Sequence, residues 1–335
     1  MSLSEKEALL YLSQAAPRGQ VRRWLKAEGS PNAAYARHGR NPLWTVSRLA
    51  DFGIEVVTQC DAQFPERLNA IPDAPLVLYH RGSLESLRAP TVAIVGARRC
   101  TRYGFEIARS MGCTFANHAL TVVSGLARGI DGAAHKGVLD GSGRAAAVLG
   151  SGLLQLYPRE NTRLAEAIIA SGGALITEYL PDAPPLKGHF PERNRIISGL
   201  AEAVIVVEAS QRSGSLITAR LALEQGRDVF AVPGPVTSQV SGGCHRLIKQ
   251  GAGLVEDAND VLAEFGIDSG VVREALEPPP ELQPVFEKVL STPTSAEQIA
   301  VELGLPVADV GITLVHLELS GFVAQRPDGY IRLLL

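Results

Sequence analysis

Residues 187–200, which read KGHFPERNRIISGL, place an aromatic ring, cations and an amide directly before an apolar run. Phe190 follows Lys187 by three positions and precedes Arg193 by three, with Asn194 next in line. An exposed aromatic ring can stack on any nucleobase, and neighbouring cations can hold phosphates. These residue types therefore indicate a single-stranded nucleic acid as the ligand. The alternative is that Phe190 is a buried staple and that the arginines form surface ion pairs.

Helix geometry separates the two arginines of this stretch. At about 100° per residue, Arg193 and Arg195 point in roughly opposite directions. The apolar residues on the side of Arg193 are Ile196, Ile197 and Leu200. If these pack on a sheet, Arg193 leans over the edge of that sheet, and Arg195 turns away toward a structural or dimer contact.

A second group of cations lies in VGARRCTRYG, residues 95–104, after an apolar β-branched run. Gly96, Arg98 and Arg99 suit phosphate binding, but the GxGxxG spacing of a dinucleotide site is absent. The next apolar run ends in Ser124, where an NAD site places an acid for the ribose. A GxxxxGK[ST] loop is also absent. The pattern disfavours NAD and P-loop nucleotides, and we expect no cofactor and no metal.

The loop SGLARGIDGAAH, residues 124–135, is rich in glycine. Gly125 and Gly129 allow close approach of the backbone to a ligand, Arg128 adds a cation, and the helix that follows offers free N–H groups to an anion. The alternative is tight packing between a strand and a helix. Asp131 and His135 also raise the option of an acid–base pair.

A third loop, RSGSLITAR, covers residues 212–220. Ser213, Gly214 and Ser215 supply hydroxyl groups and backbone donors at the start of a helix, which suits a phosphate group or simple helix capping.

The elements that position these loops follow from the apolar pattern. The β-branched runs TVAIVG, LTVVSG, RAAAVLG, GALITEY, AVIVVEA and DVFAVPG alternate with helical stretches from Thr91 onward. This alternation predicts a doubly wound α/β domain, in which a parallel sheet is covered on both faces and ligands bind at the carboxyl ends of the strands.

The remaining segments predict smaller parts. Residues 1–55 read as a small helical domain, and the core is expected over residues 56–265, with Leu76–His80 as an added edge strand. Residues 266–280 read as a linker. Residues 281–335 read as a helix, a helix-turn-helix and a hairpin at Asp328-Gly329, which is the pattern of a winged-helix domain.

Composition limits the partners. Residues 88–250 carry 18 basic and 12 acidic groups, whereas residues 281–335 carry 3 and 7, so an anionic partner is expected for the middle only. The cysteines are scattered without CxxC spacing, which favours a reducing compartment and excludes a zinc motif. Neither a signal peptide nor an apolar run of membrane-spanning length is present, so we expect a cytoplasmic protein without a membrane partner.

Together these motifs resemble DNA-processing protein A, DprA, of the Smf family. The matching segments include FPERLNAIPDAPLVLYHRG, VAIVGARRCTRYG, VSGLARGIDGAAHKG, AVLGSGLLQLYPREN, FPERNRIISGLAEAVIVVEA and SGSLITARLALEQGRDVFAVPG. With GGCHRLIKQGA they cover residues 64–252 almost continuously and in order.

The resemblance implies an extended Rossmann-like core between a small helical (SAM-like) domain and a winged-helix domain. It implies a protein without catalysis that binds single-stranded DNA, protects incoming strands and loads RecA during natural transformation or repair. Binding to double-stranded DNA is left open. The family's DNA pocket combines the arginine loop, the glycine-rich loop and a Lys-x-x-Phe element, which correspond here to Arg98 and Arg99, Ser124–Gly129, and Lys187 with Phe190. Homodimers form through the far end of the core, where Leu247 and Ile248 are the candidates.

The C-terminal domain departs from a typical DNA reader. Its second helix, Pro306–Ser320, contains no Arg or Lys, whereas a recognition helix needs them for bases and phosphates. We therefore expect it to contribute little to DNA affinity, which disfavours a winged-helix transcription factor. The other alternative is a phosphoribohydrolase of the lysine-decarboxylase-like type. Its PGGxGTxxE signature would fall near SGSLITAR, where no acid stands beside the glycine.

Overall fold

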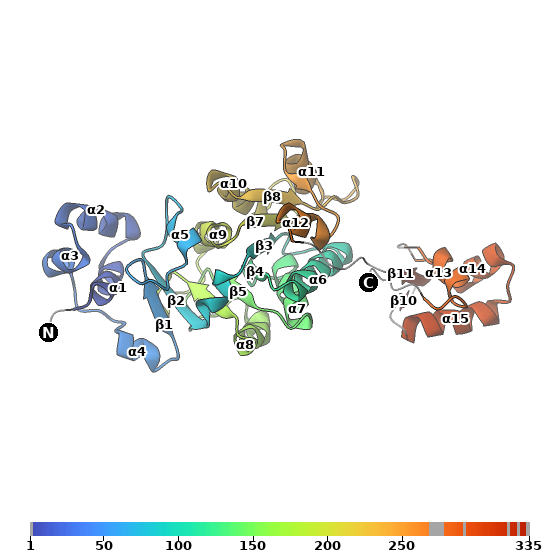
Figure 1. Ribbon diagram of the computed structural model, residues 1–335, viewed down its shortest axis with the longest axis horizontal. Coiled ribbons are helices and arrows are strands. Elements are labelled where there is room, and N and C mark those ends of the chain that lie inside the picture. The colour runs from blue at the N-terminus through green and yellow to red at the C-terminus, as the bar shows by residue number, and fades with distance from the viewer. Residues whose placement is uncertain (1–2, 268–277, 291–292, 320–321, 327–328, 333–335) are drawn as a thin grey trace. The chain divides into compact units, whose positions relative to one another are not determined.

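A nine-stranded sheet runs through the first of two compact units, Met1–Ile267 and Asp268–Leu335. The computed structural model describes residues 3–267, 278–290, 293–319, 322–326 and 329–332 (Figure 1). The strand order is β1-β2-β6-β5-β4-β3-β7-β8-β9. The strands are β1 (Glu55–Thr58), β2 (Val77–Gly82), β3 (Thr91–Val95), β4 (Thr121–Ser124), β5 (Ala145–Val148), β6 (Ala174–Thr177), β7 (Ala203–Val206), β8 (Asp228–Ala231) and β9 (Gly253–Leu254).

The strands from β3 to β9 pair in parallel, and β1 and β2 add to β6 in antiparallel fashion. The chain builds outward from β3 to β6 on one side and then returns to place β7, β8 and β9 on the other. The order therefore reverses between β3 and β7, and their carboxyl ends form the topological switch point where ligands bind in such sheets. The predicted doubly wound fold is confirmed.

One strand assignment was wrong. The segment expected at the edge became β2, which is enclosed between β1 and β6, and β1 is the edge strand at that end of the sheet. The strand β1 has only four residues, and it follows directly on the helices of the N-terminal region. Such a short run carries too few alternations to indicate a strand by itself.

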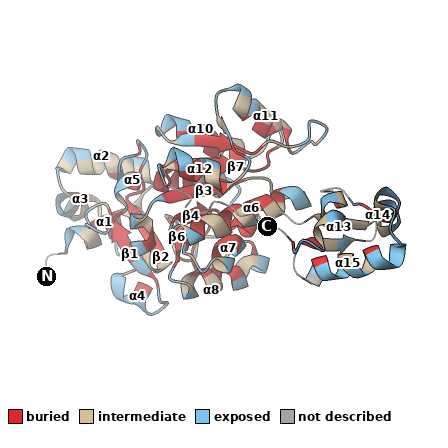
Figure 2. Ribbon diagram, turned by 45° about the vertical axis from the view of Figure 1, so that its right-hand side comes forward, coloured by how far each residue is buried: buried red, intermediate tan, exposed pale blue. Residues whose placement is uncertain are grey.

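Helices cover both faces of the sheet, as Figure 1 shows. One core joins the sheet to α6 (Arg102–Asn117), α7 (Ile130–Asp140), α8 (Thr162–Ala170) and α12 (Ala258–Glu264). The other joins it to α5 (Glu66–Asn69), α9 (His189–Leu200), α10 (Ser215–Glu224) and α11 (Gly242–Lys249). The central strands are buried between these layers, while the outer faces of the helices are exposed (Figure 2). Burial on both faces explains why the strands read as continuous apolar runs.

The N-terminal helices pack against the β1–β2 end of the same unit. They are α1 (Glu5–Ala15), α2 (Arg18–Glu28), α3 (Pro31–His38) and α4 (Val46–Ala50). A capping box between Ser4 and Glu7 starts α1, whose buried residues Leu9, Leu10 and Leu12 join the first core. The boundary predicted at residue 55 between a helical domain and the core stays a prediction.

The second unit is a winged-helix domain. It comprises α13 (Gln283–Lys288), α14 (Ala296–Leu303), α15 (Val307–Leu319) and a hairpin of β10 (Val323–Arg326) and β11 (Gly329–Arg332). Asp328, in the predicted turn, and residues 268–277 of the predicted linker lie outside the described residues. Among the described helices none is long and apolar enough by itself to cross a membrane, and only α14 with α15, bent by 116°, pass on combined length and composition.

Candidate nucleic-acid interface

A cavity of about 820 Å³ opens at the switch point between β3 and β7. Its walls come from the loop after β3, the first turns of α9, the loop after β5 and the start of α10. The predicted residues that line it are Gly96, Arg98, Arg99, Lys187, Phe190, Arg193, Asn194, Ser213, Gly214 and Ser215. Three separate stretches of the sequence therefore meet at one site, as the parallel sheet predicts.

Arg193 forms the floor of this cavity. Its side chain leans toward the carboxyl edge, as predicted, but the residue is only 4% exposed. Its Nη1 donates to the carbonyl of Gly125 at 2.9 Å and to the carbonyl of Val148, at the ends of β4 and β5. Burial lowers the pKa of Arg193 to about 10, so the guanidinium stays charged at neutral pH. Arg193 therefore holds two strand ends together beneath the ligand space and offers little surface to a phosphate.

Asp131, near the start of α7, is the counter-charge to this buried cation. Its carboxylate accepts the backbone N–H groups of Gly125 at 3.1 Å and Ala127 at 3.4 Å. Burial raises the pKa of Asp131, while Arg193 opposes that shift. The loop after β4 is therefore fixed by a cation on its carbonyl side and an anion on its N–H side.

Of residues 124–129, only Ala127 lines the cavity, and the rest of this glycine-rich loop supports it. A Cβ on Gly125 would stand 2.6 Å from the guanidinium of Arg193, so the close approach needed at this position is to Arg193 and not to a ligand. Gly129 has φ of +72°, and a Cβ there would meet the carbonyl of Ala97 at 2.3 Å. Glycine at this position lets the second loop pack against the first.

Two other predicted residues of this loop are also engaged within the protein. Ser124 is buried, and its Oγ donates to the carbonyl of Ile94 at 2.6 Å. Arg128 is exposed, but it lies outside the cavity lining and donates to Glu160 at 2.7 Å. The structure corrects the expectation that Ser124 and Gly125 present their surface to a ligand, because both are buried.

Phe190 forms one wall of the cavity. Its ring packs on Gly150, where a Cβ would come within 2.8 Å of Cδ1. The guanidinium carbon of Arg98 lies 5.1 Å from the ring centroid, which is a cation–π contact. Lys187 is exposed on the segment that leads into α9, and Arg99 is exposed beside Arg98. Phe190 is thus half-buried at the rim and is not the buried staple of the alternative interpretation.

Sequence reasoning missed Tyr157, which lines the cavity beside Phe190 with ring centroids 5.6 Å apart. It belongs to the loop after β5, at the same carboxyl edge as the other loops. The available signal was an aromatic residue in the loop after the RAAAVLG run.

The start of α10 forms the opposite wall. The Oγ atoms of Ser213 and Ser215 lie 2.7 Å apart, and Ser213 Oγ accepts the backbone N–H of Ser215 at 3.3 Å. Asn194 donates from Nδ2 to the carbonyl of Gly214 at 3.4 Å, which connects α9 to α10. Ser213 and Ser215 both line the cavity, where their hydroxyl groups are hydrogen-bonded to each other.

The start of α6, where a dinucleotide fold binds pyrophosphate, is filled from within the chain. The buried carboxylate of Glu208, just after β7, accepts the backbone N–H of Thr101 at 2.8 Å and its hydroxyl at 2.5 Å. A Cβ on Gly104 would stand 2.4 Å from this carboxyl carbon. The carboxylate of Glu208 already occupies the N-terminal end of α6, so a phosphate has no room there.

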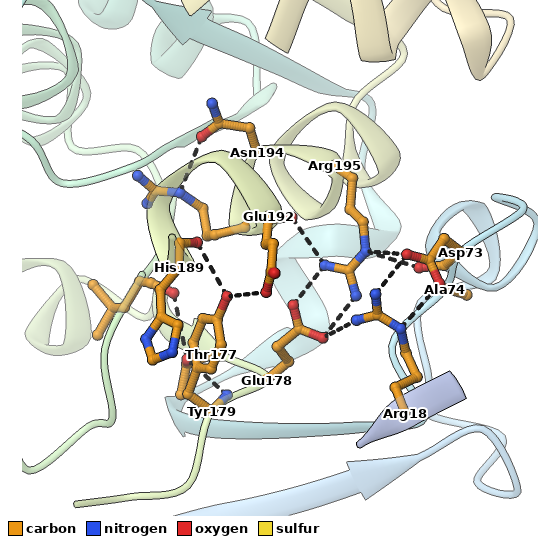
Figure 3. A network of polar contacts seen from close by, with 12 residues as sticks. Arg18, Asp73, Ala74, Thr177, Glu178, Tyr179, His189, Glu192, Asn194 and Arg195 are labelled. Carbon is orange, nitrogen blue, oxygen red and sulfur yellow. Dashed lines mark hydrogen bonds and ion pairs between the residues drawn. The ribbon is translucent and has the colours of Figure 1, made fainter. Parts of the chain in front are cut away.

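Arg195 of α9 points into a network of polar contacts with Glu178, Asp73 and Arg18, which Figure 3 shows. It donates from Nη1 and Nη2 to the two carboxylate oxygens of Glu178, each at 2.6 Å, and from Nε to the carbonyl of Asp73 at 2.9 Å. Arg18 of α2 donates to the same Glu178 at 2.6 Å and to Asp73 at 2.9 Å. Of the structural and dimer roles predicted for Arg195, these contacts show the structural one.

The predicted dimer residues lie on α11, away from the cavity lining. Leu247 is only 8% exposed and packs into the second core, and Ile248 is half-buried against the same core. Most of the surface of Leu247 is therefore used within its own chain. The dimer surface stays a prediction.

Comparison with known proteins agrees with this architecture. The family model for DNA recombination-mediator protein A matches residues 55–266, and the model for the DprA winged helix domain matches residues 272–329. Protein Smf of Escherichia coli (strain K12) is 44% identical over 287 residues, covering 82% of this chain and 76% of that protein. DNA processing protein DprA of Streptococcus pneumoniae is 48% identical over 205 residues, covering 61% and 72%.

Solved structures show the same likeness. The X-ray structure of DNA processing protein A from Streptococcus pneumoniae superposes with a TM-score of 0.68 at 37% identity, covering 79% of this chain and 99% of that one. DNA processing protein A from Helicobacter pylori, described for its single-stranded DNA binding mode, gives 0.57 at 28% identity, covering 63% and 95%. The family model spans more than half of the sequence, and this chain therefore belongs to the DNA recombination-mediator protein A family, DprA.

Proposed function

We propose that this protein is a cytoplasmic recombination mediator that binds single-stranded DNA in the switch-point cavity. One observation carries the proposal: the cavity combines the cations of Arg98, Arg99 and Lys187 with the rings of Phe190 and Tyr157. Rings stack on every base, and cations follow the phosphates, so such a site binds single strands with little dependence on sequence. The family membership and the Helicobacter pylori relative support the same ligand.

The chemistry around the cavity favours binding without catalysis. His135 is completely buried in α7, and burial together with the charge of Arg193 lowers its pKa to about 3. A neutral, inaccessible imidazole does not exchange protons with a ligand in the cavity. The carboxylate of Asp131 is engaged by two backbone N–H groups. The acid–base pair considered from sequence is thereby disfavoured.

Within this proposal the protein acts as a homodimer, protects incoming strands and loads RecA onto them. The family model supports the recombination-mediator role, and the dimer, the protection of strands and the loading of RecA rest on the resemblance drawn from the sequence. A direct test follows RecA filament assembly on single strands already coated with a single-strand-binding protein, with and without this chain. Unchanged assembly would contradict the loading role, and sedimentation of the protein alone tests the dimer.

The cavity itself is tested by salt titration of the affinity for a fluorescent oligo(dT). Phe190→Ala should weaken binding by about 5- to 150-fold at one salt concentration, because stacking contributes ~1–3 kcal/mol per base. Lys187→Ala should reduce the slope of log affinity against log salt by about 0.7, the value for one phosphate contact on a single strand.

Arg109→Ala is the matched control, because Arg109 is an exposed, ion-paired cation of α6 outside the cavity lining. It should leave both affinity and slope close to those of the unmodified protein. If Phe190→Ala and Lys187→Ala also bind like the unmodified protein, the cavity is not the DNA site.

A further inference from the structure

Tyr157 is an exposed aromatic residue on a loop that is otherwise firmly anchored. The residue is 42% exposed, whereas Leu149 and Leu153 of the same loop are buried in the core. The backbone N–H groups of Gly152 and Leu154 donate to the carbonyls of Ala183 at 2.9 Å and Pro181 at 2.8 Å. The loop is therefore fixed before any ligand arrives, and the exposure of Tyr157 is not the result of a loose segment.

The far end of this loop is fixed as well. Asn161 donates from Nδ2 to the carbonyls of Leu126 at 2.9 Å and Ala127 at 3.2 Å, which ties it to the loop after β4. Pre-organised aromatic residues bind with a small entropy cost, because little freedom is lost when the ligand stacks. Tyr157 has the setting of a binding residue.

The environments of the two rings differ. Phe190 has Gly150 against its ring and the guanidinium of Arg98 over it. Among the described residues, no cation stands over the ring of Tyr157. Tyr157 is thus the more accessible platform of the pair.

The angle between the rings decides what they can hold. The two planes are inclined by 55°, with centroids 5.6 Å apart. A nucleobase is flat, so one base cannot stack in full on both rings. Two bases can each stack in full on one of the rings if the bases are inclined to each other by an angle similar to that between the rings.

We propose that Tyr157 forms a second base-binding subsite, so that the cavity holds two successive bases of a single strand, one on Phe190 and one on Tyr157. The proposal rests on the proposed function and adds an unstacking step to it, because neighbouring bases inclined in this way no longer stack on each other. Strands whose bases stack weakly then bind better, and oligo(dT) is favoured over oligo(dA).

The test compares Tyr157→Leu and Tyr157→Phe with the unmodified full-length protein, using fluorescent oligo(dT) and oligo(dA) at one salt concentration. Tyr157→Leu should weaken oligo(dT) binding by about 5- to 150-fold, the range for one lost stacking contact, and should shrink the preference for oligo(dT) over oligo(dA). Tyr157→Phe should retain binding within about twofold, because the phenyl ring still stacks.

Photocrosslinking of the unmodified protein to oligo(dT) containing 5-iododeoxyuridine supplies an independent readout, with crosslinks expected at Tyr157 and at Phe190. Absence of a Tyr157 crosslink, or equal losses for Tyr157→Leu and Tyr157→Phe, would overturn the second subsite. If Tyr157→Leu binds normally while Phe190→Ala does not, the subsite is refuted and the proposed function stands. If neither substitution weakens oligonucleotide binding, the proposed function itself fails.

Discussion

His135 shows how the site constrains a single residue. Neither of its ring nitrogens has a hydrogen-bond partner among the described residues, and the side chain is completely buried. Burial disfavours the charged imidazolium, and protonation would add a second positive charge near Arg193, so the pKa of His135 falls from 6.5 to about 3. Burying an imidazole without hydrogen-bond partners costs free energy, and protonating it in that position costs more.

This burial predicts a pH-dependent stability. Below about pH 6.5 the unfolded chain binds a proton at residue 135 that the folded chain does not bind, so the free energy of unfolding falls as the pH drops toward 3. Between about pH 7.5 and pH 5.5 this residue alone should lower it by about 1.4 kcal/mol. His135→Leu should remove that part of the pH dependence.

Urea unfolding at the two pH values measures the effect. Trp24 and Trp44 both lie in the first unit, so tryptophan fluorescence reports the unit that contains His135. His316→Gln, at an exposed histidine of α15, is the control and should change nothing. Equal pH dependence for His135→Leu and the unmodified protein would show that His135 is protonated in the folded state.

The helix α9 makes contacts on two opposite faces at once. One face places Arg193 under the cavity, and the other anchors Arg195 in the network with Glu178 and Arg18 (Figure 3). The side chains of Arg195 and Glu178 are 7% and 10% exposed, whereas that of Arg18 is 26% exposed. The N-terminal helix α2 is thereby connected to the helix that carries Phe190.

This network predicts that replacing its two arginines lowers the free energy of unfolding by unequal amounts. Arg195→Leu should lower the free energy of unfolding by about 3 kcal/mol or more, because it leaves a buried carboxylate short of its main partner. Arg18→Leu should cost about 1 kcal/mol, since Arg18 is partly solvated and Arg195 still compensates Glu178. Urea unfolding followed by tryptophan fluorescence compares the two. A cost for Arg18→Leu equal to that for Arg195→Leu would mean that α2, and not the core, holds Glu178 in place.

The same helix shows what its sequence could predict. Helical spacing separated Arg193 from Arg195 and placed Ile196, Ile197 and Leu200 on the sheet, where all three are buried. It could not predict that both arginines are buried. Their partners lie far along the chain, at Gly125 and Val148 for one arginine and at Asp73 and Glu178 for the other.

The loops around the cavity, like α9, could be predicted only in part from the sequence. Strand–helix alternation placed the arginine, α9 and α10 segments at one edge, because parallel strands end together. Glycine in the loop after β4 was interpreted as room for a ligand, whereas at Gly125 the room is filled by Arg193. A glycine in the sequence indicates close approach, but only the fold shows which group approaches.

At the scale of the whole molecule, charge separates the two units. The cavity and its surroundings belong to the basic middle of the chain, while residues 281–335 carry 3 basic and 7 acidic groups. In the winged-helix unit, Ile312 of α15 is 60% exposed and Val315 is 46% exposed, on a helix whose only Asp or Glu residues are Asp309 and Glu318. An acidic and apolar helix of this kind repels a phosphate backbone, although the equivalent helix of a typical winged-helix domain binds DNA.

Removal of residues 281–335 should therefore leave the affinity for oligo(dT) within about twofold and the salt slope unchanged, because no cation of the cavity is lost. The sheet, both of its cores and the cavity lie within the first unit, so the shortened chain retains every residue that the proposed site uses. Anisotropy titration of the shortened and full-length chains at matched salt measures the difference. A tenfold loss of affinity would place part of the DNA contact on the winged-helix unit, in spite of its charge, and would require its few basic residues to act together with the cavity.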